Sequence, residues 1–247
     1  MKLIFIRHAE PDYEHDTLTE KGWKEAKLLA ERVKKWEVND IYLSPLGRAQ
    51  DTASFSVKAL GKETTTLDWL QEFWCPVTDP TTRRFGVPWD FMPEFFTKEP
   101  LLYDKDHWFD ADVLAANAEL KERALRTFQE FDSLLASYGY VREGGFYRVD
   151  HEKYDKIKKD AEDVTLVFFC HLGITLLLLG YMMGISPSLL WQSIFIAPSS
   201  VTVLNAEERM NHAAFFRAQV IGDTRHLYDG NEPISSAGCF VAPWQET

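Results

Sequence analysis

The first seventy residues alternate between short apolar runs and amphipathic segments. The run 2–6 is apolar and ends at Arg7-His8, which predicts a buried strand presenting these two side chains at its carboxyl end. Thr19 precedes a segment that carries apolar residues on one helical face and Glu20 in its first turn. Because an acidic first turn suits the helix dipole, this segment is predicted to be an amphipathic helix lying on a sheet.

The same alternation repeats once more before residue 73. Residues 41–43 are predicted to form a second strand, followed by Ser44 as a capping residue and Pro45 at the first helical position. The predicted helix runs to about Leu60 and carries Arg48 in its first turn. A third strand, at 65–70, leads to Glu72.

An irregular stretch separates these elements from the second half of the chain. Residues 73–109 are rich in proline and in aromatic side chains that follow neither a helical nor a strand period. An irregular segment of this length is usually functional, so we predict a lid insert at about 73–110, although a packed satellite core is an equal alternative. Beyond it the sequence predicts helices at 111–138, 172–183 and 188–193, a hairpin at 140–149 turning at Gly144-Gly145, and strands at 164–169, 200–204 and 214–221.

This order of elements predicts the fold class. Strands alternating with helices indicate an α/β protein, a three-layer α/β/α sandwich with a mostly parallel central sheet. A chain of 247 residues with 45% hydrophobic residues can bury such a core as one domain, residues 1–247, with the lid as an insert. The apolar stretch 164–185 is long enough for a membrane span, but it contains His171 and three glycines, which favours a buried strand, a turn and a buried helix.

Composition narrows the class of partner. A formal net charge of −11 disfavours nucleic acid, because a duplex binder needs a basic field, but it allows a small phosphorylated ligand held by a few arginines. The three cysteines lie far apart without metal-ligand spacing, which argues against disulfides and zinc. The N-terminal apolar run is too short for a signal-peptide core, so a cytoplasmic location without membrane attachment is expected.

Three polar motifs fall at predicted strand ends. They are Arg7-His8-Ala9-Glu10, the segment 44–53 with Arg48, and Cys170-His171-Leu172-Gly173. Phosphoryl transfer needs a nucleophile in line with the leaving oxygen and fixed positive groups around the other phosphoryl oxygens. Two arginines and two histidines at converging strand ends meet that need. No cysteine has an arginine six positions later, and the chain contains neither GxxxxGK nor HExxH.

With these motifs the sequence resembles the histidine phosphatase superfamily, which is phosphoglycerate mutase-like in fold, and within it the phosphatase branch. The resemblance covers most of the chain outside the aromatic insert and is carried, in the family's order, by Arg7-His8-Ala9-Glu10, Leu18 to Gly22, Ser44-Pro45 with Arg48 and Thr52-Ala53, His171, Ser200 to Val203, and Gly222 to Leu227. It implies that His8 is the nucleophile that carries the phosphoryl group, with its other ring nitrogen held by a backbone carbonyl. It further implies phosphate binding by Arg7, Arg48 and His171, and Glu72 as proton donor and later base, for which Glu63 and Glu94 are competitors.

The chain also departs from the family pattern. Ala9 replaces a glycine, Pro11 stands where a hydroxyl residue is common, and Leu172 replaces another glycine. Glu14 stands where many relatives have a phosphate-contacting asparagine, and an acid there would repel a dianion. Arg83 and Arg84 are either solvated loop charges or contacts for a second anionic group of the substrate.

The expected activity is metal-independent phosphomonoester hydrolysis on a small phosphorylated substrate, with no cofactor and no metal. Three alternatives stay open: mutase-type phosphoryl transfer, a catalytically silent phospholigand- or protein-binding module, and metal binding by His8 with Glu10 or His15. The family's longer mutase motif is missing after Glu72, where Phe73-Trp74-Cys75-Pro76 stands. The sequence predicts neither the physiological substrate nor the oligomeric state.

Overall fold

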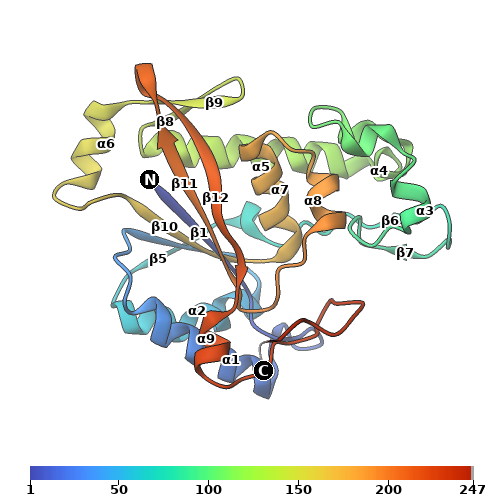
Figure 1. Ribbon diagram of the computed structural model, residues 1–247, viewed down its shortest axis with the longest axis horizontal. Helices are drawn as coiled ribbons and strands as arrows, with labels where there is room; N and C mark the ends of the chain where they lie inside the picture. Colours follow the sequence, from blue (N-terminus) through green and yellow to red (C-terminus); the bar gives the residue numbers. More distant parts are fainter. Residues whose placement is uncertain (246–247) are drawn as a thin grey trace.

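A computed structural model describes residues 1–245 of the chain, and a mixed eight-stranded sheet runs through its centre (Figure 1). Neighbouring strands are parallel from β5 to β1 and antiparallel from β1 to β8. The parallel half contains the strands expected from the buried apolar runs. The strands, in their order across the sheet, are β5 (Thr64–Thr66), β4 (Asp40–Leu43), β10 (Thr165–Cys170), β1 (Lys2–Arg7), β11 (Val201–Glu208), β12 (Ala213–Asp223), β9 (Phe146–Val149) and β8 (Tyr140–Glu143).

Helices cover both faces of the sheet, so the predicted three-layer arrangement is confirmed (Figure 1). Alternate residues of a strand point to opposite faces, and β1 shows this directly. Ile4 and Ile6 pack with residues of α1 and α2, whereas Leu3 and Phe5 join a larger core with α5 and α7. The helices are α1 (Glu20–Val33), α2 (Gly47–Leu60), α3 (Pro93–Phe96), α4 (Asp112–Ala115), α5 (Ala118–Ser137), α6 (His151–Lys158), α7 (Leu172–Met183), α8 (Pro187–Ser193) and α9 (Arg225–Asp229).

Some element boundaries differ from the sequence prediction. Helix α2 begins at Gly47, because the Ser44 side chain accepts a hydrogen bond from the Leu46 backbone at 3.2 Å and closes a turn ahead of the helix. The predicted helix 111–138 is interrupted, and Asn117 caps α5 through a 3.1 Å bond from the Glu119 backbone. The predicted third strand is only β5, followed by a 3-10 turn at Asp68–Leu70. Helix α6 was not predicted.

The aromatic insert packs against the main body. It contains only short elements, among them β6 (Val77–Thr78), β7 (Phe85–Gly86) and the 3-10 turns Pro100–Tyr103 and Trp108–Asp110. Phe73, Phe91 and Trp108 are buried in the larger core, where Trp108 meets Trp191 of α8 edge to face at 5.2 Å. The satellite-core alternative therefore describes much of this segment.

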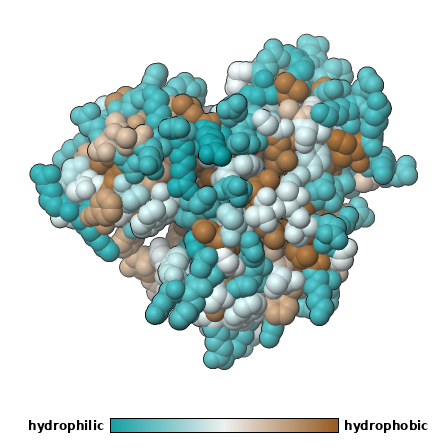
Figure 2. Space-filling model, turned by 180° about the vertical axis from the view of Figure 1, so that it is seen from behind, coloured by the Kyte–Doolittle hydropathy of each residue, from teal (hydrophilic) through white to brown (hydrophobic). Residues whose placement is uncertain are grey.

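Hydrophilic residues cover much of the face of the molecule that Figure 2 shows. Figure 2 shows one face of the molecule on which apolar residues form scattered spots among hydrophilic ones. Within residues 1–245, no helix is both long and apolar enough to cross a membrane. The stretch 164–185 is instead β10 followed by α7, with His171 between them.

Candidate active site

His8 and His171 come together because their strands are neighbours. Arg7 on β1 is the register partner of Cys170 on β10, and the two strands are parallel. The residue that follows each strand therefore leaves the sheet at the same edge, the usual place for ligands in open α/β sheets. The imidazole ring centroids lie 5.1 Å apart, and both side chains are buried, His8 at 2% and His171 at 0% exposure.

The orientation of the His8 ring is fixed by the backbone. Its Nδ1 lies 2.8 Å from the carbonyl oxygen of Ala9, and since a carbonyl only accepts, Nδ1 carries the proton. The other ring nitrogen, Nε2, then has a free lone pair. Burial and the neighbouring Arg7 charge hold the pKa of His8 well below its usual range, so the ring is neutral at pH 7. A neutral, oriented imidazole is the form that can attack phosphorus.

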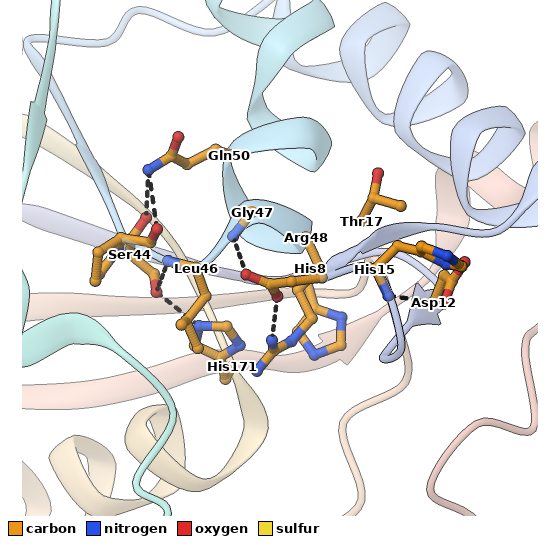
Figure 3. A network of polar contacts seen from close by, with 12 residues as sticks. His8, Asp12, His15, Thr17, Ser44, Leu46, Gly47, Arg48, Gln50 and His171 are labelled. Atoms are coloured by element: carbon orange, nitrogen blue, oxygen red, sulfur yellow. Dashed lines mark hydrogen bonds and ion pairs between the residues drawn. The ribbon is translucent and has the colours of Figure 1, made fainter.

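His171 is held on the opposite side by the turn before α2. Its Nε2 lies 2.7 Å from the Ser44 hydroxyl, while its buried Nδ1 has no protein partner in the described chain (Figure 3). Desolvation and the nearby His8 keep the pKa of His171 well below its usual range. Ser44 was read from the sequence as a helix cap, and its contact with His171 could not be anticipated from local patterns.

Arg7 and Arg48 place two guanidinium groups beside these rings. Their charges contribute to the lowered pKa values of both His8 and His171. Arg7 donates to the backbone carbonyl of Ile196 at 2.7 Å and to that of Ala237 at 3.4 Å. Among the described residues, the buried Nε atoms of both arginines have no hydrogen-bond partner. Fixed cations around a neutral nucleophile form an electrostatic setting suited to an anionic phosphoryl group.

Asp16 is a site residue that the sequence analysis missed. Its Oδ1 accepts a 2.5 Å hydrogen bond from Arg48 Nη1, and its Oδ2 accepts from the Gly47 backbone at 2.7 Å. No motif marks this residue, because its partners are brought together only by the loop that precedes α1. The acid expected to repel phosphate, Glu14, is exposed, and its backbone N–H donates to Asp12 at 3.0 Å. Asp16, and not Glu14, is therefore the acidic residue bonded to Arg48, one of the candidate phosphate-binding residues.

We expect Asp16→Asn to strengthen inhibition by inorganic phosphate about fivefold. Asparagine keeps the oxygen that accepts from Arg48 but removes a negative charge near the anion. Because the Asp16 side chain is 44% exposed, the effect is about 1 kcal/mol, the value for charges about 4 Å apart in a water-like dielectric of about 80. The inhibition constant in a p-nitrophenyl phosphate assay measures this change. Asp12→Asn is the matched control, because Asp12 pairs with His15 at 2.8 Å in the same loop. Equal inhibition constants in native protein and Asp16→Asn would contradict the expectation.

Glu72 lies against the start of α7. Its Oε1 accepts hydrogen bonds from the Phe73 backbone at 2.8 Å and the Ile174 backbone at 3.1 Å. Burial raises the pKa of this carboxyl group, although the backbone donors and the Arg7 charge oppose the shift. The competitors Glu63 and Glu94 are both exposed. A carboxyl group with a raised pKa beside Arg7 suits proton donation.

Gly173 allows Glu72 and the insert to meet. A Cβ atom on Gly173 would lie 2.6 Å from Glu72 Oε1 and 2.5 Å from Cζ3 of Trp89. Trp89 belongs to the insert, so an aromatic ring from this segment borders the candidate acid. Trp191 Nε1 fixes the same turn by donating to the Gly173 carbonyl at 3.0 Å. The insert thus supplies part of the apolar environment that raises the pKa of Glu72.

Gly173→Ala is expected to lower kcat about a hundredfold, because the added methyl group displaces Glu72 or Trp89 and misplacement of a catalytic group by about 1 Å has that cost. Steady-state kinetics with an alkyl phosphate would measure the effect. The control is Gly145→Ala in the β8–β9 hairpin, where an added Cβ meets no atom within 4 Å. An unchanged kcat in Gly173→Ala would show that the Glu72 position is not critical.

The backbone that carries His8 is tied to the segments around Thr52 and Ser199. The Ala9 N–H donates to the Thr52 hydroxyl at 2.9 Å, and the Ser199 N–H donates to the His8 carbonyl at 3.0 Å. Ser199 has a left-handed φ of 58° and its hydroxyl lies 3.0 Å from His226 Nε2. These contacts limit movement of His8.

The C-terminal segment also reaches the site. Besides the Ala237 carbonyl on Arg7, the Ser235 hydroxyl donates to Glu10 at 2.6 Å, and Ser235 is buried. Arg83 and Arg84, considered above as contacts for a second anionic group of the substrate, are exposed on the insert. Within residues 1–245, three or more possible metal ligands come together only at His151, Glu208 and His212, so His8 does not form such a group with Glu10 and His15.

A family model matches the N-terminal part of this chain. Residues 3–84 match the model of the histidine phosphatase superfamily (branch 1), a range that includes Arg7, His8, Arg48 and Glu72. The N-terminal third of the chain therefore resembles the histidine phosphatase superfamily. His171 lies outside the matched residues and joins the candidate site through the pairing of β1 with β10. A search of curated protein sequences gives no match.

Solved structures share the fold of this chain at low sequence identity. A mycobacterial glucosyl-3-phosphoglycerate phosphatase is 19% identical with a TM-score of 0.57, covering 90% of this chain and 98% of its own. The α-ribazole phosphatase from Shigella flexneri is 15% identical with a TM-score of 0.52, covering 91% and 97%. A phosphoserine phosphatase from Entamoeba histolytica, in complex with 3-phosphoglyceric acid, is 16% identical with a TM-score of 0.53, covering 92% and 98%. These similarities confirm the predicted phosphoglycerate mutase-like fold.

Proposed function

We propose that this protein is a metal-independent phosphatase that hydrolyses a small phosphomonoester through a phosphohistidine on His8. The observation that carries the proposal is the neutral, oriented His8 ring beside His171 and two guanidinium groups. The nucleophilic nitrogen is free because the other one is bound to the Ala9 carbonyl. Relatives in fold that are phosphatases of phosphorylated metabolites support a small substrate.

In the first step, the lone pair on His8 Nε2 attacks phosphorus and the bond from phosphorus to the ester oxygen breaks. Arg7, Arg48 and His171 hold the phosphoryl oxygens, where charge must be stabilised through the transition state. Glu72 gives its proton to the leaving oxygen, so that an alcohol departs and Glu72 is left as a carboxylate.

In the second step, Glu72 takes a proton from water as the water oxygen attacks phosphorus. The phosphorus–nitrogen bond breaks, inorganic phosphate leaves, and His8 returns to its neutral form with Glu72 protonated again. The two steps use one carboxyl group in opposite directions, for which a raised pKa is suited. We further propose that residues 1–247 act as one domain. In this proposal the insert at about 73–110 borders the candidate site through Trp89. We also expect a cytoplasmic location.

Trapping the intermediate tests the proposal. The native protein is mixed with a ³²P-labelled phosphomonoester, quenched in alkali, which preserves phosphohistidine, and checked for label on the chain. We expect label on the native protein, none on His8→Ala, and normal labelling of the exposed-histidine control His107→Ala. Equal labelling of His8→Ala would overturn the proposal, and no labelling or turnover with any phosphomonoester would favour the silent binding module.

Analysis of the products separates hydrolysis from mutase activity, and a chelator tests for metal catalysis. A phosphatase releases inorganic phosphate, whereas a mutase isomerises 3-phosphoglycerate with little net release. A chelator should leave the rate unchanged, since the proposed steps use only side chains of this chain. A panel of phosphorylated metabolites and phosphopeptides would then identify the preferred substrate.

A further inference from the structure

A cluster of two histidines and a glutamate lies at the opposite end of the sheet from the catalytic residues. His151 is the first residue of α6, Glu208 is the last residue of β11, and His212 lies in the connection between β11 and β12. Strand β11 lies beside β1 (Figure 1). Because the two strands are antiparallel and Lys2 pairs with Asn205, Glu208 lies beyond the amino end of β1, whereas His8 follows its carboxyl end. The cluster is therefore separate from the proposed phosphatase site.

Both imidazoles converge on one carboxylate oxygen. His151 Nε2 lies 2.8 Å and His212 Nδ1 lies 3.0 Å from Glu208 Oε1. The ring centroids are 4.9 Å apart, and the ligand atoms of the three residues all lie within 4.8 Å of one another. Segments far apart in the sequence thus place two nitrogens and an oxygen around one point.

These separations are close to those of a zinc site. Zinc binds histidine nitrogen and carboxylate oxygen at about 2.0–2.2 Å in tetrahedral geometry, which puts neighbouring ligand atoms about 3.3 Å apart. The two short contacts need to open by only about half an ångström, within the reach of small side-chain rotations. Two imidazoles with one carboxylate favour zinc or a similar transition metal over magnesium or calcium, which prefer oxygen ligands.

The surroundings of the cluster also suit a metal ion. The second ring nitrogen of His151, Nδ1, lies 3.7 Å from Asp155 Oδ2, the side from which a carboxylate commonly orients a metal-bound histidine. The nearby cations are already paired, Arg148 with Glu143 at 2.7 Å and Arg209 with Glu207 at 3.6 Å. The side chains of His151, Glu208 and His212 are 39%, 30% and 64% exposed, which leaves room for water as a fourth ligand.

We propose that His151, Glu208 and His212 bind one Zn²⁺ ion, with water as the fourth ligand and Asp155 as a positioning residue. The ion ties helix α6 to the β11–β12 hairpin through side chains of both segments. Its role is to stabilise this end of the sheet, and it takes no part in the reaction at His8. The site goes beyond the proposed phosphatase activity and does not depend on it.

Titration calorimetry with Zn²⁺, on protein first stripped with a chelator, tests the proposal. We expect one bound ion per chain, and binding at least tenfold weaker in His151→Ala and in His212→Ala. Asp155→Asn should weaken binding about tenfold, as is typical for loss of a carboxylate behind a metal-bound histidine. Co²⁺ in place of Zn²⁺ should give the visible absorption of a tetrahedral site in the native protein and not in the two histidine variants.

His107→Ala is the matched control, because His107 is an exposed histidine 3.3 Å from Asp110 and lies outside the cluster. Circular dichroism and p-nitrophenyl phosphate turnover verify that each variant is folded. Zn²⁺ affinity that is the same in native protein and in the His151→Ala, His212→Ala double variant would overturn the site. Zinc binding together with a p-nitrophenyl phosphate turnover rate that chelation leaves unchanged would support the site. It would also show that the ion takes no part in the phosphatase reaction.

Discussion

Replacing His8 with alanine is expected to reduce kcat/KM for p-nitrophenyl phosphate at least about a thousandfold. The nucleophile of a covalent mechanism cannot be replaced by its neighbours, and its loss in other enzymes removes most of the rate enhancement. His171 cannot take over, because its Nε2 is engaged by the Ser44 hydroxyl and its position is fixed by the turn before α2. The rate constants of purified native and variant protein measure the effect.

Loss of activity in His8→Ala must be separated from loss of structure, since His8 is buried and its replacement leaves a small void. His107→Ala should keep native kinetics, and the melting temperatures of both variants should be compared with that of native protein. A folded His8→Ala variant with native kcat/KM would exclude His8 as the nucleophile and favour the binding-module alternative.

Glu72→Gln is expected to lower kcat for an alkyl phosphate by about 10²–10⁴, the usual contribution of a positioned acid. The same variant should retain much more activity on p-nitrophenyl phosphate, because nitrophenolate departs without needing a proton. Glutamine keeps the size of the side chain and an oxygen for the Phe73 and Ile174 backbone donors. The ratio of the two kcat values therefore isolates proton donation from packing.

The pH dependence has a definite direction. Burial raises the pKa of Glu72, so its carboxyl group stays protonated to higher pH than an exposed glutamate would. A proton donor works only while protonated, so kcat for the alkyl phosphate should fall as pH rises through that raised pKa. Glu72→Gln should lose this limb of the profile. Glu63→Gln, at an exposed glutamate, is the control, and the same limb persisting in Glu72→Gln would assign the acid to another group.

Local patterns predicted the elements that deliver the candidate site. The apolar run 2–6 and the run 164–169 became β1 and β10, and each is followed by a histidine. Thr19 caps α1 by accepting from the Gly22 backbone, as its position before an amphipathic segment indicated. These predictions succeed because strand burial and helix capping depend on residues close in sequence.

Strand direction in the second half of the sheet depended on distant contacts. The sequence predicted a mostly parallel sheet, whereas β11, β12, β9 and β8 pair antiparallel from β1 outward. Strands 200–204 and 214–221 were recognised, but an apolar run has the same periodicity whichever way its partner runs. The antiparallel hairpin of β11 and β12 also carries Glu208 and His212 to the far end of the sheet.

The sequence by itself determined which residues stand at strand ends. It therefore grouped a candidate histidine nucleophile with two arginines and a second histidine. Only the tertiary structure decided that Asp16 bonds Arg48, that Gly173 lets Glu72 meet Trp89, and that His151 joins Glu208 and His212. The physical reason is the separation of the interacting residues along the sequence. Periodicity and capping depend on neighbours along the chain. These contacts instead join distant segments, which are brought together by the packing of the whole core.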